Sequence, residues 1–182
     1  MEMPASSNPA VPSQSFLVPN FDEMMKLEKE YTDFYDKYQR VVLISFGTMF
    51  MPPIEEMDLI IDAIKLSDPK VLGFIISMKD YAPSYEGIKA LDWPNIMLKT
   101  HVPQKQILNH QKTLLFLTHC GANGVVEALY YGKPMIGFPK MSEQKSVSLK
   151  LKLLDAAWIK DETTTPEILA QKIEEISAPE SP

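Results

Sequence analysis

A glycine-containing turn between an apolar run and a helix-like segment is the part of the sequence best suited to chemistry. Residues 114–118 form an apolar run with the length of a buried strand, and residues 119–124 read His-Cys-Gly-Ala-Asn-Gly. Residues 125–131 have helical character, and Gly132 and Pro134 stand where they end a helix. Glycines let a ligand approach closely, and a helix start offers unpaired N–H groups with a partial positive charge. The sequence therefore predicts a phosphate-binding turn.

Further polar side chains accompany this turn. His119 ends the apolar run, and Glu127 lies three residues beyond the second glycine. Gln104 precedes the turn, whereas Glu143 and Gln144 follow the next apolar run. The turn does not match the GxGxxG pattern of dinucleotide-binding proteins, so the surrounding residues must identify its ligand.

The elements that position these residues are strands alternating with helices. Strands are predicted at residues 41–46, 71–77, 96–100, 114–118, 135–138 and 157–160. Helices are predicted at residues 20–38, 54–66, 104–109, 125–131, 142–154 and 166–176, with a short one within residues 79–94. Nearly all-apolar strands alternating with helices indicate a doubly wound, Rossmann-like parallel sheet of about six strands with helices on both faces. Ligands bind beyond the carboxyl ends of such strands, where the polar residues named above converge.

Two helices carry more detailed predictions. Asn20 and Glu23 form a capping box at the start of the first helix, whose aromatic stripe we expect to pack in the core. That stripe contains Phe21, Met24, Tyr31, Phe34 and Tyr38. The buried side of the second helix is predicted to contain Ile54, Met57, Ile60, Ile61 and Ile64.

The ordered set of residues closely resembles the signature of the UDP-glycosyltransferases, which move a sugar from a UDP-sugar onto a small acceptor. The resemblance extends over roughly residues 40–175 and includes Ser45-Phe46-Gly47-Thr48. It implies the C-terminal, donor-binding half of a GT-B architecture, in which two domains face each other across a cleft. The other half binds the acceptor and supplies a catalytic histidine supported by an aspartate.

The resemblance implies donor-binding roles for eleven residues. These are Ser45, Thr48, His101, Gln104, His119, Gly121, Asn123, Gly124, Glu127, Glu143 and Gln144. Glu127 would accept from the ribose hydroxyls, Gln104 would contact the uracil edge, and His119 would donate to a phosphate oxygen. Taken singly, Glu127 can also serve only to stabilise a helix start, and the 45–48 turn only to form local hydrogen bonds.

Two residues depart from the family pattern. His101 stands where the family usually has a tryptophan that stacks on uracil, and imidazole offers less stacking area. Glu143 stands where aspartate is commoner, which shifts the carboxylate that would contact the transferred sugar.

The sequence offers no metal site. It contains no Asp-x-Asp triplet and no His/Cys/Asp cluster with metal-ligand spacing, so we expect a metal-independent transferase with no cofactor besides the UDP-sugar co-substrate. Cys120 is expected to be a small packed residue rather than a reactive thiol, and His110 a structural residue.

Composition excludes several classes. The 182 residues suit one full domain, and the net charge of −6, from 18 basic and 24 acidic residues, disfavours nucleic acid as a partner. A single cysteine excludes an internal disulfide. No apolar run approaches the ~18 residues of a membrane span, and the N-terminus lacks the apolar core of a signal peptide, so the chain as given is expected to be soluble. Its compartment stays open, because relatives are often anchored in the endoplasmic reticulum membrane.

The predicted domain organisation is a proline- and serine-rich arm over residues 1–19, a donor-binding domain over residues 20–178 and a tail over residues 179–182. We expect no catalytic base in this chain, so an acceptor domain or partner subunit would supply it. The resemblance implies inverting transfer of a hexosyl or glucuronosyl group to a small acceptor. Two alternatives stay open: a non-catalytic UDP-sugar-binding or interaction module, and one half of a sugar-nucleotide epimerase.

Overall fold

The structure, a computed structural model, describes residues 25–47, 51–79, 83–91 and 93–178. Several predictions lie outside these ranges: the arm over residues 1–19, the capping box of Asn20 and Glu23, the stripe residues Phe21 and Met24, the contact residue Thr48, and the tail over residues 179–182.

The described strands form one parallel sheet. Its strands are β1 (Arg40–Ser45), β2 (Leu72–Ser77), β3 (Ile96–Lys99), β4 (Thr113–Thr118), β5 (Met135–Gly137) and β6 (Ala157–Ile159). They lie in the order β3-β2-β1-β4-β5-β6, and every neighbouring pair is parallel. The chain thus builds outward from β1 in one direction and then returns to build outward from its other side. The prediction of a doubly wound, Rossmann-like sheet is confirmed.

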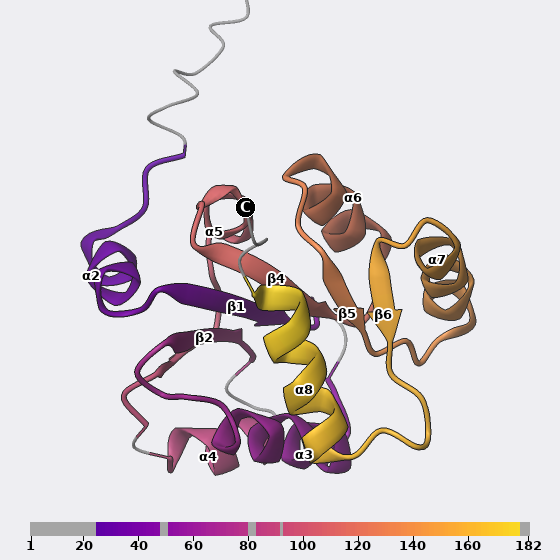
Figure 1. The fold of residues 1–182 in the computed structure, drawn as a ribbon, viewed down its shortest axis with the longest axis horizontal. Helices are drawn as coiled ribbons and strands as arrows, with labels where there is room; N and C mark the ends of the chain where they lie inside the picture. The colour runs from indigo at the N-terminus through magenta and orange to yellow at the C-terminus, as the bar shows by residue number, and fades with distance from the viewer. Residues whose placement is uncertain (1–24, 48–50, 80–82, 92, 179–182) are drawn as a thin grey trace, which may run out of the picture.

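Helices cover both faces of the sheet (Figure 1). They are α2 (Lys29–Lys37), α3 (Ile54–Lys65), α4 (Pro83–Lys89), α5 (Gln104–Asn109), α6 (Ala122–Tyr130), α7 (Ser142–Leu153) and α8 (Pro166–Ser177). Helices α3, α4 and α8 pack on one face, and α2, α5, α6 and α7 pack on the other. At the last helix, Thr165 accepts a hydrogen bond from the N–H of Ile168, and Pro166 is its first residue.

The alternation of side chains along the central strand explains both layers. In β1, Val42 and Ile44 belong to the core under α3 and α8, whereas Val41 and Leu43 belong to the core under α2 and α5. All four side chains are fully buried. A strand that is apolar on both sides can be covered only by a layer on each side, so its composition dictates the three-layer arrangement.

Two local predictions were wrong. The predicted helix over residues 20–38 is not continuous, because residues 25–28 are not helical and α2 begins at Lys29, after an extended N-cap residue, Glu28. Ile54 is 53% exposed, because it is the first residue of α3, where neighbouring elements no longer cover the stripe. The other members of both stripes within the described ranges are buried, which confirms their assignment to the core.

Candidate functional site

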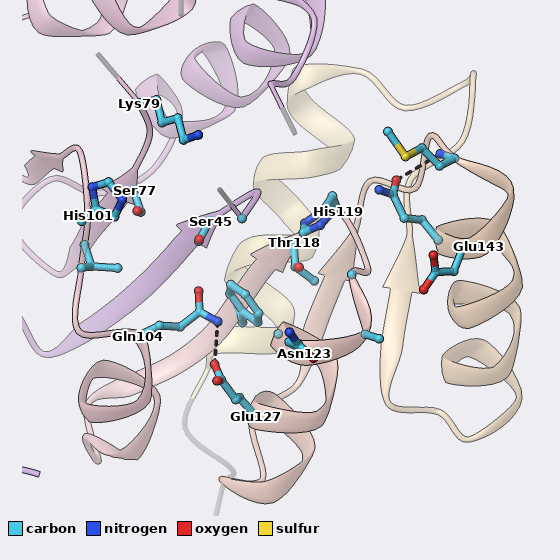
Figure 2. Close-up of a pocket in the computed structure, with 18 of the residues that line it drawn as sticks. Ser45, Ser77, Lys79, His101, Gln104, Thr118, His119, Asn123, Glu127 and Glu143 are labelled. Atoms are coloured by element: carbon cyan, nitrogen blue, oxygen red, sulfur yellow. Dashed lines mark hydrogen bonds between the residues drawn. The ribbon is translucent and has the colours of Figure 1, made fainter. Parts of the chain in front are cut away.

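An open cavity of about 610 Å³ lies at the carboxyl end of the sheet, where the strand order reverses between β1 and β4. Ser45, Ser77 and Thr118 line it from the last positions of β1, β2 and β4. The other walls come from the starts of α5, α6 and α7 (Figure 2). Parallel sheets of this order bind ligands at such a reversal point.

The cavity brings together ten of the eleven residues that the sequence singled out. They are Ser45, His101, Gln104, His119, Gly121, Asn123, Gly124, Glu127, Glu143 and Gln144. The eleventh, Thr48, lies outside the described residues. The four loops that carry these residues are far apart in the sequence, and the sheet topology alone makes them neighbours.

Gln104 and Glu127 form one wall as a pair. The Gln104 Nε2 donates to Glu127 Oε2 at 2.8 Å, and Lys105 Nζ lies 3.9 Å from Glu127 Oε1 (Figure 2). Both side chains are partly buried, so the hydrogen bond fixes the carboxylate in the cavity wall. The carboxylate is thereby oriented before any ligand arrives, which lowers the ordering cost of binding.

His119 lines the cavity, and its ring lies close to two glycines. A Cβ placed on Gly121 would lie 2.4 Å from the His119 Nε2, and one on Gly47 would lie 3.0 Å from its Cε1. The ring therefore excludes a Cβ at Gly121, whereas Gly47 is favoured chiefly by its left-handed φ of 74°. Burial lowers the pKa of His119 below its usual 6.5, so the ring is neutral at pH 7 and donates a single N–H.

The turn after His119 has an unusual backbone. Cys120 has a φ of 63°, a left-handed conformation that is uncommon for a residue with a side chain, and it is fully buried. Burial raises the pKa of its thiol to about 11, so Cys120 is a packed residue as predicted. The strained residue turns the chain directly from β4 into α6, whose N-terminus faces the cavity.

Helix α6 begins three residues earlier than predicted. It starts at Ala122 with Gly121 as its N-cap, so Asn123 and Gly124 lie in its first turn and Glu127 in its second. The predicted start at residue 125 would have placed Glu127 in the first turn, and that placement was wrong. Glycine and asparagine are poor helix formers, but a first turn tolerates them, because its N–H groups have no partner within the helix in any case.

At the opposite end of the cavity, Glu143 and Gln144 belong to the first turn of α7. The Gln144 Oε1 accepts from the N–H of Lys140 at 2.9 Å and from that of Met141 at 3.1 Å. Gln144 is buried and Glu143 is exposed. The amide oxygen therefore caps the helix, while the carboxylate stays available to a ligand.

Ser77, Lys79 and Thr118 also line the cavity, although they were not among the predicted site residues. Each ends a strand or follows one closely, and that position was the signal for finding them. The Thr118 Oγ1 is buried without a hydrogen-bond partner among the described residues, which indicates a hydroxyl that a ligand can satisfy. Lys79 adds a positive charge to the cavity wall (Figure 2).

His110 lies outside the cavity and is structural, as predicted. Its ring stacks on Tyr35 with centroids 3.6 Å apart, and its Nδ1 accepts from the Lys112 N–H at 3.2 Å. Burial, followed by the nearby charges of Lys112 and Lys133, lowers the pKa of His110 below 6.5, against the opposite influence of Asp36.

The lowered pKa values of His110 and His119 predict that the chain loses stability as the pH falls. In the unfolded chain both histidines take up protons near pH 6.5, whereas in the folded chain they do so only at lower pH. The free energy of unfolding should therefore fall from pH 6.5 downward, until the folded-state pKa values are passed. Urea unfolding at pH 5 to 8 measures this slope, which should be shallower in His110→Gln. An unchanged slope would contradict the assignment.

The described residues contain neither a membrane-spanning helix nor a metal-binding cluster. No helix among the described residues is both long and apolar enough to cross a membrane. No group of three or more His, Cys, Asp or Glu side chains there could hold a metal ion.

Comparison with known proteins shows the relationship of the chain. A family model described as "UDP-glucoronosyl and UDP-glucosyl transferase" matches residues 18–176. UDP-glucuronosyltransferase 2A3 of Cavia porcellus is 38% identical over 119 residues, and UDP-glucuronosyltransferase 2B13 of Oryctolagus cuniculus is 34% identical over 153 residues. These alignments cover 64% and 78% of this chain but 21% and 27% of the relatives, so the chain spans about a quarter of their length.

Solved structures agree on the fold. Os79 from O. sativa in complex with UDP has a TM-score of 0.66 at 23% identity and aligns with 80% of this chain and 34% of its own. Arabidopsis thaliana UGT89C1 complexed with UDP has a TM-score of 0.68 at 22% identity, with 82% and 37% covered. The described sheet thus corresponds to one half of a GT-B architecture, and the chain belongs to the UDP-glucoronosyl and UDP-glucosyl transferase family.

Proposed function

We propose that the cavity binds the UDP part of a UDP-sugar and that the chain is the donor-binding half of a glycosyltransferase. The observation that carries this proposal is the gathering of ten motif residues from separate loops around one cavity at the reversal point of the sheet. Membership of the family supports the same ligand, as do the structural neighbours that were solved with UDP.

The nucleoside is proposed to lie against α5 and α6. Glu127 accepts from the two ribose hydroxyls, because a carboxylate has two acceptor oxygens and is already oriented by Gln104. Gln104 then offers its remaining polar atoms to the uracil edge. His101, which lines the same cavity, provides the flat surface for the base.

The diphosphate is proposed to lie over the start of α6. The N–H groups of Asn123 and Gly124 belong to the first turn, where they lack partners within the helix and carry the positive end of the helix dipole. His119 donates one N–H, and the hydroxyls of Ser45 and Thr118 complete the set of donors around the cavity. We propose that these groups balance the diphosphate charge without a resident metal ion.

The transferred sugar is proposed to lie toward α7. There the Glu143 carboxylate accepts hydrogen bonds from its hydroxyls and the Gln144 amide donates to them. An oxygen of the acceptor attacks the anomeric carbon, the bond from that carbon to the UDP oxygen breaks, and the configuration inverts. The acceptor proton passes to a base outside this chain, which an acceptor domain or partner subunit supplies. His119 stabilises the charge that develops on the departing UDP.

A thermal shift experiment with UDP tests the proposal. UDP at 100 times its dissociation constant should stabilise the chain by about 2.7 kcal/mol. For a domain of this size that raises the unfolding midpoint by roughly 5–10 °C. The Glu127→Ala variant should lose this rise, because the ribose hydroxyls then face a wall without an acceptor.

The matched control is Glu162→Ala, which removes an exposed carboxylate outside the cavity and should keep the full rise. ADP should give a much smaller rise than UDP, because Gln104 and His101 are placed for a pyrimidine. An equal rise with ADP, or a full rise in Glu127→Ala, would refute the proposed binding mode. Binding of UDP without transfer, even with an acceptor half present, would support a non-catalytic module instead.

A further inference from the structure

Glu56 is a buried carboxylate outside the cavity whose position stability alone does not explain. It lies in the first turn of α3 and is 5% exposed. Its Oε1 lies 2.7 Å from Lys140 Nζ and 3.7 Å from Lys160 Nζ, while its buried Oε2 has no hydrogen-bond partner among the described residues. Burial removes most of the water around the Glu56 carboxylate, and this cost offsets much of its attraction to the lysines, although 41% of the Lys140 side chain stays exposed. The contact is therefore better explained by the position that it gives to Lys140 than by a gain in stability.

Lys140 connects this carboxylate to the cavity wall. It lies between β5 and α7, and its side chain reaches Glu56 while its backbone N–H donates to the Gln144 Oε1 at 2.9 Å. Met141 makes the second N–H bond to the same oxygen, at 3.1 Å. Met141, Glu143 and Gln144 all line the cavity, whereas Glu56 and Lys140 do not. Lys140 is therefore held at both ends, by a buried charge on one side and by a cavity residue on the other.

The second lysine on Glu56 has a different location. Lys160 directly follows β6, its backbone N–H donates to the Gly137 carbonyl, and it does not line the cavity. Glu56 thus contacts two lysines. Only Lys140 is joined by a hydrogen bond to a residue that lines the cavity. Variants of the two lysines can therefore distinguish a positioning role of Glu56 from a role in stability.

We infer that Glu56 is a positioning residue: through Lys140 it holds the loop between β5 and α7, so that Glu143 and Gln144 face the sugar of the donor. The inference rests on the proposed function, in which these two residues bind the transferred sugar. It assigns Glu56 no contact with the ligand. Loss of the contact should leave the UDP part of the site unchanged, because Gln104, His119 and Glu127 belong to other loops.

The test compares Glu56→Gln, Lys140→Met and the double variant with Lys160→Met as the matched control. Calorimetry gives dissociation constants for UDP, UDP-glucose and UDP-glucuronate, and amide exchange by NMR follows the N–H groups of Lys140 and Met141. Both single variants should speed the exchange of these amides and weaken the UDP-sugars by about three- to tenfold, the range for one or two hydrogen bonds. UDP itself should stay within about twofold, and the double variant should match the single ones, because they break one contact.

Lys160→Met should leave unchanged both the amide exchange and the difference in affinity between UDP and the UDP-sugars, although it removes a contact to the same carboxylate. If Glu56→Gln fails to fold, Lys140→Met carries the test, because 41% of its side chain is exposed. Unchanged amide exchange, equal weakening of UDP and UDP-sugars, or a wild-type chain that binds UDP and both UDP-sugars equally would overturn the inference. A wild-type chain that binds no nucleotide would instead refute the proposed function, and amide exchange would then decide alone whether Glu56 holds the loop.

Discussion

Gly121→Ala should weaken UDP binding by about 10- to 100-fold, the range for losing a hydrogen bond to a charged group. The alanine Cβ would lie 2.4 Å from the His119 Nε2 and 2.7 Å from its Cε1, closer than non-bonded atoms approach. The ring must leave its place in the cavity, and its N–H leaves the diphosphate. The cause is steric, because Gly121 has a φ of −67°, which alanine adopts freely.

Calorimetry on Gly121→Ala, His119→Ala and the double variant measures this effect. The double variant should bind UDP as His119→Ala does, because the methyl group acts only through the ring that is then absent. Gly87→Ala is the matched glycine control, since a Cβ there meets nothing within 4 Å and lies outside the cavity. Retention of UDP affinity within about twofold in Gly121→Ala would show that the ring makes no contact with the diphosphate.

Phe116→Ala and Phe74→Ala should each lower the free energy of unfolding by about 3–5 kcal/mol. Phe116 is 1% exposed in β4 and Phe74 is fully buried in β2, so each truncation leaves a cavity in a packed core. For a chain of this length the midpoint should fall by roughly 6–20 °C. Urea unfolding at a temperature where both variants stay folded measures the loss.

The two phenylalanines differ in their relation to the site. Phe116 lines the cavity and would contact a Cβ at Gly124 at 3.5 Å, whereas Phe74 lies in the core under α3 and α4 and does not line the cavity. Only Phe116→Ala should therefore also weaken UDP, while Phe74→Ala keeps its affinity in the folded fraction. Equal loss of UDP affinity in both variants would mean that stability alone governs binding. Leu153→Ala, at an 87% exposed position, should change stability by no more than about 0.5 kcal/mol.

The strands could be predicted because their apolar composition agrees with their buried position in the sheet. Both faces of β1 and β4 are apolar, so an uninterrupted apolar run marks each of them, and the carboxyl-end rule then places Ser45 and His119 in one crevice. The boundaries of helices were less predictable where a residue type is common both in loops and in the first turn of a helix. Asn123 and Gly124 read as a loop although they belong to α6, because an N-terminal turn tolerates poor helix formers.

Contacts between distant side chains could not be predicted. The bond between Gln104 and Glu127 joins different helices, and no local periodicity encodes it. Glu56 reads in the sequence as an ordinary acidic residue at a helix start, and its burial depends on where Lys140 and Lys160 arrive. The spacing of His119 and Gly121 shows that they are close in the sequence, but only the structure shows that the imidazole excludes a methyl group.

The strand order also sets when the cavity can exist during folding. One edge of β1 pairs with β2, the next strand in the sequence. Its other edge pairs with the more distant β4, with Val41 opposite Thr113 and Ser45 opposite Thr118. Pairing of such high contact order is slow, because a long segment must be closed before the pairing energy is gained. A ligand in this cavity therefore recognises only chains that have completed β4 and α6. The return of ligand binding after denaturation should coincide with the slowest folding phase, which makes the ligand a reporter of the assembled sheet.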